Sequence, residues 1–351
     1  MTLRNILIAG FLLLVITSGM AYSQDVKQDS LLKSLQEQQS NVLEQMKAIP
    51  KEGATQADVD RYNQLKAQLD QLHDQIEARI SELDSEAGRR RNAVNAYNQG
   101  NEYFQERRFA EAIKSYKQAI EYDDTNYRFY KNLGQAYYQN GQYDLAASAL
   151  QNGVKLNPDD AGMYTMLGQV QFKMKKYDDA IVSFNYAIKA DSTFANAWLG
   201  KGNAYMDQKK YPEAEHDLLK ATTYDPRNAA AFYNLGIVQS EQGKIRDALG
   251  SFTQASKIQQ NDWKSFYQQA VMLNKLGRST EAIQAAENCL KYRRNYAGAY
   301  FEIGTAYKKE GNGAKAKEYF EKCLKIFGFT CLAIGIFTIV LIIYSVLFIY
   351  K

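Results

Sequence analysis

The chain has 351 residues, and its 43 basic and 39 acidic side chains give a formal net charge of only +4. Because opposite charges are interspersed, the sequence lacks the concentrated basic character expected of a protein that binds nucleic acid. Only 4 prolines accompany 26 tyrosines and 16 phenylalanines. This composition favours helices packed through aromatic side chains over a loop-rich sheet protein.

Residues 1–23 have the pattern of a secretory signal peptide. A basic start precedes an apolar run from Ile6 to Thr17, and Ala21 and Ser23 are small residues at the spacing that signal peptidase recognises. We expect cleavage after Ser23 and export of the mature chain. The alternative is an uncleaved signal anchor, although the run is shorter than the ~20 residues of a typical span.

Residues 24–91 are expected to form a helical hairpin or a coiled coil. Apolar residues are spaced three or four apart along two stretches once Gln39 fills one place of the first, namely Leu32, Leu35, Val42, Met46 and Ile49, then Leu65, Leu69, Leu72, Ile76, Ile80 and Leu83. Pro50 and Gly53 separate the stretches, and Thr55 with Asp58 matches a capping box. The apolar seam faces either the hairpin partner, which we favour, or other subunits of a homo-oligomer. The arginine-rich sequence of residues 88–92 is expected to be a solvated hinge.

From residue 93 to residue 325 the sequence repeats with a period of 34 residues. Alanine recurs without a slip at Ala112, Ala146, Ala180, Ala214, Ala248, Ala282 and Ala316. Seven units, which begin at residues 93, 127, 161, 195, 229, 263 and 297, carry small residues at their eighth place: Gly100, Gly134, Gly168, Gly202, Gly236, Ala270 and Gly304. Two helices approach closely only where a side chain is small, so each unit is expected to be an antiparallel helix pair.

Other places in the unit agree with helix pairs. Large apolar residues fill one interior place: Tyr116, Leu150, Phe184, Leu218, Phe252 and Phe320. Cys289 and Cys323 belong to a column of small residues, so we interpret them as packing residues without a redox role. Between the two helices of a unit stand Gly141, Gly243, Gly277 and Gly311, where a positive φ is easiest for glycine.

The stretches "NLGQAYYQNGQYDLAASALQNGVKLNPDD" and "GKGNAYMDQKKYPEAEHDLLKATTYDPRN" resemble the tetratricopeptide repeat (TPR) in period, small-residue columns and terminal proline. The resemblance implies an all-α fold, a solenoid of seven helix pairs. Ala270 and Ala286 depart from the pattern toward the C-terminus, and looser packing is expected there.

No arrangement typical of an enzyme or a metal site occurs in the sequence. The two histidines, His73 and His216, lie outside ligand spacings such as HExxH, and there is no CxxC pair or phosphate-binding glycine loop. Pairs of aspartates recur near expected helix starts, where carboxylates favour the N-terminal end. We therefore expect no catalysis, no cofactor and no metal.

The resemblance implies a concave groove, formed by the first helix of each pair, that binds a protein or peptide partner. The family's geometry places the following residues there: Tyr97, Asn101, Phe104, Lys131, Gln135, Tyr138, Thr165, Gln169, Phe172, Leu199, Asn203 and Met206. Asn101, Gln135, Gln169 and Asn203 form an amide column, which can pair with an extended peptide because a primary amide both donates and accepts. Alternatively, the column is ordinary exposed helix surface. The clamp that binds chaperone tails in some family members is not reproduced, because Met166 stands where an asparagine is needed.

Residues 326–350 form an apolar stretch of 25 residues without a charge. A helix of that length reaches about 37 Å, more than the ~30 Å hydrocarbon layer, so we predict a transmembrane helix. With a cleaved signal peptide, the repeats lie in the periplasm of a bacterial-type envelope. The alternative is a tail anchor with the repeats in the cytosol, since four lysines precede the span.

These elements together suggest a membrane-anchored scaffold of the cell envelope that mediates protein–protein interactions through its groove. The alternative is a periplasmic coordinator of envelope or division machinery that acts as an oligomer. A signal peptide, a coiled coil and TPR units are similar to the layout of the cell-division coordinators associated with the Tol-Pal system. That family has fewer repeats and no expected C-terminal span.

Overall fold

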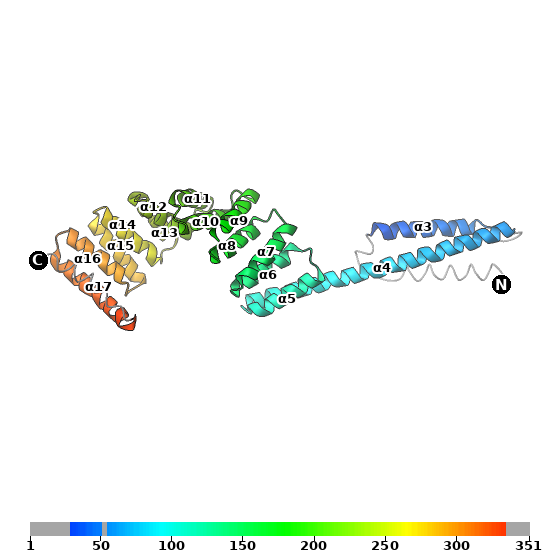
Figure 1. Ribbon diagram of the computed structural model, residues 1–351, viewed down its shortest axis with the longest axis horizontal. Helices are drawn as coiled ribbons and strands as arrows, with labels where there is room; N and C mark the ends of the chain where they lie inside the picture. The colour runs from blue at the N-terminus through cyan, green and yellow to red at the C-terminus, as the bar shows by residue number, and fades with distance from the viewer. Residues whose placement is uncertain (1–28, 51–54, 335–351) are drawn as a thin grey trace. The chain divides into compact units, whose positions relative to one another are not determined.

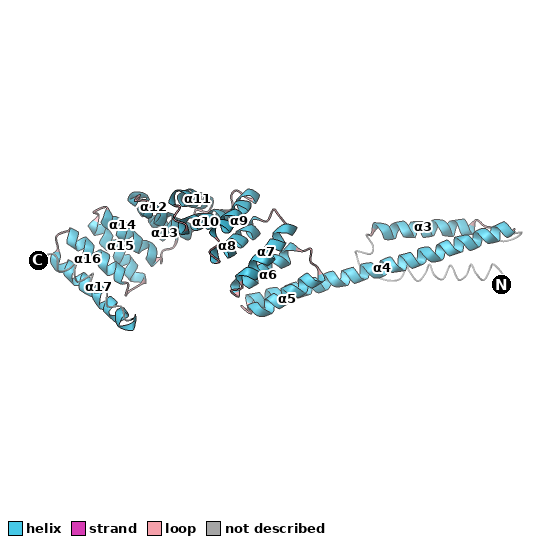
Figure 2. Cartoon of the chain, viewed as in Figure 1, coloured by secondary structure: helices cyan, strands magenta, loops and turns pink. Residues whose placement is uncertain are grey.

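The computed structural model describes residues 29–50 and 55–334. Within these ranges every regular element is an α-helix and no strand is present, which confirms the predicted all-α class (Figure 1, Figure 2). Contacts divide the chain after Ala136, within a helix, into an N-terminal body and a C-terminal body. The two bodies are described separately.

The described part of the N-terminal body contains α3 (Ser30–Lys47), α4 (Gln56–Gln105), α5 (Phe109–Tyr122) and most of α6 (Tyr127–Gln139). The C-terminal body continues with α7 (Tyr143–Leu156), α8 (Ala161–Lys173), α9 (Tyr177–Ala190), α10 (Ala195–Asp207), α11 (Tyr211–Tyr224), α12 (Ala229–Glu241), α13 (Ile245–Ile258), α14 (Trp263–Lys275), α15 (Ser279–Tyr292), α16 (Ala297–Lys309) and α17 (Gly313–Ile334).

The helices α3 and α4 pack side by side as a hairpin (Figure 1). Their apolar residues form one buried cluster of Leu32, Leu35, Val42, Ile49, Tyr62, Leu65, Leu72, Ile76 and Leu83, against which Met46, Leu69 and Ile80 pack. The seam read from the sequence is therefore buried within the chain itself. The hairpin removes this apolar surface from water without a second subunit.

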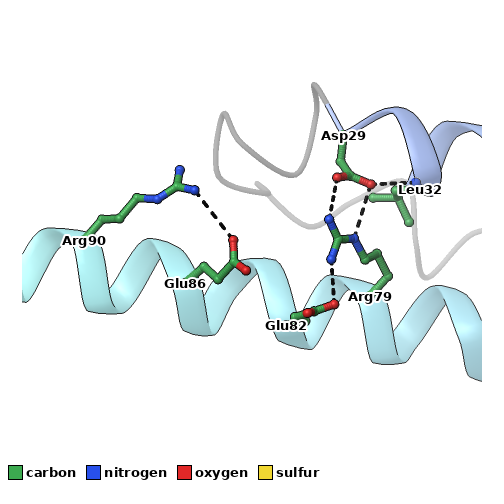
Figure 3. Close-up of polar contacts among 6 residues, drawn as sticks. All are labelled: Asp29, Leu32, Arg79, Glu82, Glu86 and Arg90. Atoms are coloured by element: carbon green, nitrogen blue, oxygen red, sulfur yellow. Dashed lines mark hydrogen bonds and ion pairs between the residues drawn. The ribbon is translucent and has the colours of Figure 1, made fainter. Parts of the chain in front are cut away.

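An ion pair sets the register of the hairpin (Figure 3). Arg79 of α4 contacts Asp29, the N-cap of α3, with 2.8 Å between Nη2 and Oδ2, and contacts Glu82 with 2.6 Å between Nη1 and Oε2. Asp29 Oδ1 also accepts a hydrogen bond from the backbone N–H of Leu32 at 2.7 Å. The hydrogen bonds from Arg79 and Leu32 lower the pKa of Asp29. One carboxylate thus caps α3 and ties it to α4.

The helix α4 continues without a break from the hairpin into the first repeat unit. Thr55 and Asp58 form the predicted capping box at its start. The expected hinge at residues 88–92 is wrong, because these residues are helical and α4 spans 50 residues to Gln105. A Cβ added at Gly88 would meet no atom within 4 Å, so nothing packed there forces the chain to bend.

The helix pairs begin where the period predicts. The first helices of pairs two to seven, which are α6, α8, α10, α12, α14 and α16, start at residues 127, 161, 195, 229, 263 and 297. The first pair consists of the last part of α4 with α5. Within pair 3, a Cβ built at Gly168 would lie 2.7 Å from Cε1 of Phe184, a residue that is 1% exposed. The small residues therefore set how closely the two helices of a pair approach.

The turn inside each pair has a positive φ in all seven pairs. Glycine supplies it at the four predicted positions, with φ between 74° and 76°. At the same place in the other pairs stand Arg107, Lys175 and Lys209, with φ of 61°, 60° and 59°. The sequence signal for this turn was incomplete, because a left-handed residue need not be glycine when the flanking helices fix the turn.

The C-terminal pairs are well packed at the places where looser packing was expected. Ala270 and Ala286 are fully buried in one cluster with Cys289 and Ile303. Rings of neighbouring helices close over this cluster, and the centroid of Tyr296 lies 5.0 Å from that of Tyr267. Aromatic residues from adjacent elements thus pack where the repeat's own large residue is missing.

The last described helix, α17, runs through the predicted boundary at residue 325 to Ile334. Residues 335–350 of the predicted span and the predicted signal peptide lie outside the described residues. Among the helices that the structure describes, none combines the length and the apolar character needed to cross a membrane. The span and the signal peptide stay predictions.

Candidate functional site

In the N-terminal body, the first member of the amide column, on α4, is hydrogen-bonded to residues of α5 and α6. Asn101 Oδ1 accepts hydrogen bonds from the hydroxyl of Tyr116 at 2.8 Å and from Nδ2 of Asn132 at 2.9 Å. Asn132 Nδ2 also lies 2.9 Å from the hydroxyl of Tyr97. Because these polar atoms bind one another, Tyr97 and Asn101 are structural residues and not the open contacts that the groove prediction expected.

The other predicted groove residues of this body are partly buried. Phe104 packs edge-on against Phe109, the first residue of α5, with 5.4 Å between ring centroids. Lys131 and Gln135 lie on α6 with partly buried side chains. The structure therefore gives no cluster of free polar groups among these N-terminal residues.

In the C-terminal body, the last member of the amide column makes the same kind of bridge. Asn203 of α10 accepts a hydrogen bond from Nδ2 of Asn234 on α12 at 2.8 Å. Asn132 and Asn234 each stand 31 residues after the amide that they bond. We call the residues at this spacing the bridging column: Asn132, Met166, Gly200, Asn234, Gln268 and Glu302.

The bridging column has no side chain at Gly200, which stands 31 residues after Gln169. Gln169 of α8 is exposed and forms no hydrogen bond with another described residue. A Cβ added at Gly200 would lie 2.4 Å from Cζ of Phe184, so the aromatic ring of α9 fills the room that a bridging side chain would need. The bridge between α8 and α10 is therefore missing, and Gln169 stays available.

A hollow of about 300 Å³ opens at this place. It is lined by Tyr138, Gln169, Phe172, Lys173, Phe184, Asn196, Leu199, Gly200 and Asn203. Aromatic contacts hold two of the rings. Tyr138 lies 5.6 Å from Tyr143 in a tilted arrangement, and Phe172 lies 5.5 Å from Tyr177 edge-on, measured between ring centroids. The hollow thus has fixed aromatic walls, which is the character of a preformed binding site.

The structure brings five residues of the predicted set together at this hollow: Tyr138, Gln169, Phe172, Leu199 and Asn203. Two predicted residues of this body lie elsewhere. Thr165 is buried and donates a hydrogen bond to the backbone oxygen of Ala161 at 2.8 Å, while Met206 packs in a cluster with Leu218. Thr165 is thus an interior residue, and Met206 is partly buried against the α10–α11 pair.

Sequence reasoning missed four lining residues, Lys173, Phe184, Asn196 and Gly200. The clearest available signal was Gly200, the one glycine of a column that otherwise holds asparagine, methionine, glutamine or glutamate. Phe184 was expected only as an interior residue, and its role as the floor of the hollow depends on the glycine beside it.

A second hollow, of about 340 Å³, lies between α10 and α11 and surrounds a buried ion pair. Lys201 Nζ lies 3.4 Å from Asp217 Oδ2, with side chains that are 15% and 2% exposed. Nδ1 of His216 lies 3.0 Å from Asp217 Oδ1, and the lysine also lies 5.2 Å from the Trp198 ring. The buried carboxylate therefore has a lysine and an imidazole as partners within the chain, and the cluster is interpreted as structural.

The described residues offer little for catalysis. No group of three or more histidine, cysteine, aspartate or glutamate side chains in this part of the chain is arranged to hold a metal ion. Cys289 and Cys323 are free and buried. Burial raises the pKa of each thiol to about 11, so neither is a ready nucleophile.

Comparison with known families matches most of the repeat region. A model described as "Tetratricopeptide repeat" matches residues 97–161, 132–195 and 233–298, a second, "TPR repeat", matches residues 202–243, and a third, again "Tetratricopeptide repeat", matches residues 297–328. No curated protein matches the chain. The family matches lie between residues 97 and 328, where the 34-residue repeats are.

Solved structures show the same architecture. The C-terminal part of a TPR repeat-containing protein from Cytophaga hutchinsonii is 17% identical, with a TM-score of 0.55 over 66% of this chain and 95% of that one. A tetratricopeptide repeat protein from Parabacteroides merdae is 15% identical, with a TM-score of 0.50 over 67% and 93%. YrrB, described as a TPR protein with an unusual peptide-binding site, is 26% identical, with a TM-score of 0.49 over 51% and 93%. The first two likenesses show the fold.

Proposed function

This chain is a tetratricopeptide repeat protein, and from that premise we propose that it is a non-catalytic scaffold that binds an extended segment of a protein partner. The binding site is the hollow beside Gly200, between α8 and α10. TPR helix pairs serve as interaction surfaces, and this hollow combines concave shape, aromatic walls and available amides.

The observation that carries the proposal is the contrast within the amide column. Asn203 is bonded to Asn234, whereas Gln169 and the neighbouring Asn196 form no hydrogen bond with another described residue. Both are exposed and line the hollow. Their amides can donate to and accept from the backbone of an extended peptide, while the rings contact its side chains.

The test is a random peptide library displayed on phage and selected against the purified full chain. Selected peptides are expected to lose about tenfold or more in affinity when Gln169 and Asn196 are both replaced by alanine, because each lost hydrogen bond costs roughly 1 kcal/mol. The matched control is Gln254→Ala, which removes an exposed glutamine of α13 outside the hollow. A library that yields no binder, or binders that ignore the double substitution, contradicts the proposal.

We further propose that the scaffold works at a membrane of a bacterial-type envelope, with the repeats exported. Support comes from the signal-peptide pattern of residues 1–23 and the uncharged stretch 326–350. Truncation after Lys325 is expected to release the protein from membranes during fractionation. Retention of the truncated chain in the membrane fraction would contradict this part of the proposal.

Oligomerisation through residues 24–91 is the weaker part of the coordinator alternative. The apolar seam is buried inside the α3–α4 hairpin, which leaves little reason for these residues to associate with another copy. Light scattering of the full chain and of a variant without residues 24–91 tests it. The same number of subunits in both would reject the alternative.

A further inference from the structure

We propose that the segment bound beside Gly200 carries a large apolar side chain with a carboxylate on a neighbouring residue. This inference rests on the proposed function and specifies the chemistry of its ligand. The apolar group fills the hollow, and Lys173 at its edge binds the carboxylate.

The apolar part follows from the walls of the hollow. Three partly buried lining residues, Tyr138, Phe172 and Leu199, present aromatic or aliphatic surface to the hollow. The ring of the buried Phe184 packs where a side chain at position 200 would lie, so it lines the hollow next to Gly200. A hollow of about 300 Å³ takes one aromatic or long aliphatic side chain, whose burial stabilises the complex through the hydrophobic effect.

The carboxylate follows from the charge at the edge. Lys173 is the one charged residue among those that line the hollow, its side chain is exposed, and it forms no ion pair with another described residue. Lys173 therefore offers a positive charge that no described carboxylate pairs with.

The amides decide how the backbone of the segment lies. Gln169 and Asn196 come from different helices, α8 and α10, and both line the hollow. Hydrogen bonds to both from one extended backbone hold the segment across the hollow and present one side chain to it. A folded partner surface would satisfy these amides less well, because its backbone groups already bond within the partner.

The experiment measures fluorescence anisotropy of the full chain with the labelled peptide Gly-Asp-Phe-Asp-Gly, which places a carboxylate on either side of the ring. Replacement of Phe by Ala in the peptide is expected to weaken binding about tenfold or more, since burial of a phenylalanine side chain contributes about 1.5–3 kcal/mol. Replacement of both Asp by Asn is expected to weaken binding about threefold, the effect of an exposed ion pair.

Reversing the charge at residue 173 tests whether the ion pair, and not a general change in the protein, determines the peptide preference. Gly-Lys-Phe-Lys-Gly is expected to bind the wild type more weakly than Gly-Asp-Phe-Asp-Gly does. Lys173→Glu is expected to weaken binding of Gly-Asp-Phe-Asp-Gly and to strengthen binding of Gly-Lys-Phe-Lys-Gly. Lys189→Glu is the matched control, because it introduces the same charge change at an exposed residue of α9 outside the hollow. That control variant is expected to keep the wild-type order of the two peptides.

The outcomes distinguish this inference from the proposed function. Library peptides that bind through Gln169 but show no preference for an apolar residue beside an acid overturn the inference and leave the proposed function standing. No peptide binding at all rejects both. Unchanged peptide preference in Lys173→Glu, with binding intact, rejects the role of the carboxylate.

Discussion

Helix pairs 4 and 5 are consecutive units of the repeat, but they carry different residues at two equivalent positions. In the bridging column, pair 5 has Asn234, which bonds Asn203, while pair 4 has Gly200 and a hollow. At the next residue, pair 5 has the buried Leu235, while pair 4 has Lys201 in an ion pair with a buried aspartate. The backbone is helical in both cases.

The difference shows how a repeat acquires a site without losing its framework. The small-residue columns that set helix spacing are intact in pair 4, where Gly202 and Ala214 are both buried. The departures fall beside these columns. One departure removes the side chain that would bridge to Gln169, and the other adds a charge together with its partner. Each of the following changes converts one arrangement toward the other.

The largest effect is expected from Lys201→Leu, which gives pair 4 the residue of pair 5 but leaves Asp217 buried without its lysine. Breaking a buried pair in this way costs about 3 kcal/mol of unfolding free energy. The double substitution Lys201→Leu with Asp217→Ser reproduces Leu235 and Ser251 and is expected to return to within about 1 kcal/mol of the wild type. Chemical unfolding followed by circular dichroism measures both. Equal losses in the single and double variants would show that the pair is not coupled.

The next effect is expected from Gly200→Ala, because the new Cβ would lie 2.4 Å from a carbon of the buried Phe184 ring. Overpacking of this kind costs about 1–3 kcal/mol. The matched control is Gly250→Ala on α13, where a Cβ meets no atom within 4 Å and alanine is expected to stabilise the helix by about 0.5–1 kcal/mol. Opposite signs for the two substitutions support the packing argument, and equal signs contradict it.

The sequence was sufficient for the framework and insufficient for the site, and the reason is physical. Small residues equivalent to Gly168 and Ala180 recur in every unit because the two helices of each pair must approach to the same distance. A period of 34 residues therefore predicts where helices start. The use of an amide depends on a residue 31 positions away on another helix pair. Asn101 and Gln169 belong to one column, yet Asn132 bonds the first and Gly200 leaves the second free.

The hinge expected at residues 88–92 failed for a related reason. The glycine lowers helix propensity and the three arginines suggest solvent exposure. Neither feature terminates a helix that is stabilised on both sides of this sequence. Packing of Leu83 on the hairpin side and of Ala93 on the repeat side fixes α4 beyond each end of this sequence. Local composition could not report contacts made on either side of it.

A smaller effect is expected from Asn234→Ala, which removes the bridge to Asn203. Loss of one hydrogen bond between partly buried side chains costs roughly 1 kcal/mol. Gln169→Ala is the counterpart at the open place and is expected to leave the unfolding midpoint unchanged, because its side chain bonds no described residue. The two variants should therefore separate stability from peptide binding. A destabilised Gln169→Ala would place that residue among the structural bridges.

The smallest effect concerns Glu302, the member of the bridging column in pair 7, which is buried and accepts a hydrogen bond from Nδ2 of Asn274 at 2.7 Å. Burial raises the pKa of its carboxyl group. Between the ordinary and the raised pKa the native state binds more protons than the unfolded state, so the free energy of unfolding falls as pH rises through that interval.

Glu302→Gln keeps an oxygen that can accept from Asn274 and removes the titration. The variant is expected to unfold at higher denaturant concentration than the wild type near neutral pH, and the difference should vanish below the ordinary pKa of glutamate. Glu318→Gln gives the opposite sign, because the hydrogen bond from Lys322 lowers the pKa of Glu318. Unfolding midpoints across this pH range measure both variants. A Glu302→Gln variant that is less stable at neutral pH would mean that the charged carboxylate is itself favourable, so that pair 7 uses the bridging column for an ionic contact and not for the neutral bridge seen in pair 5.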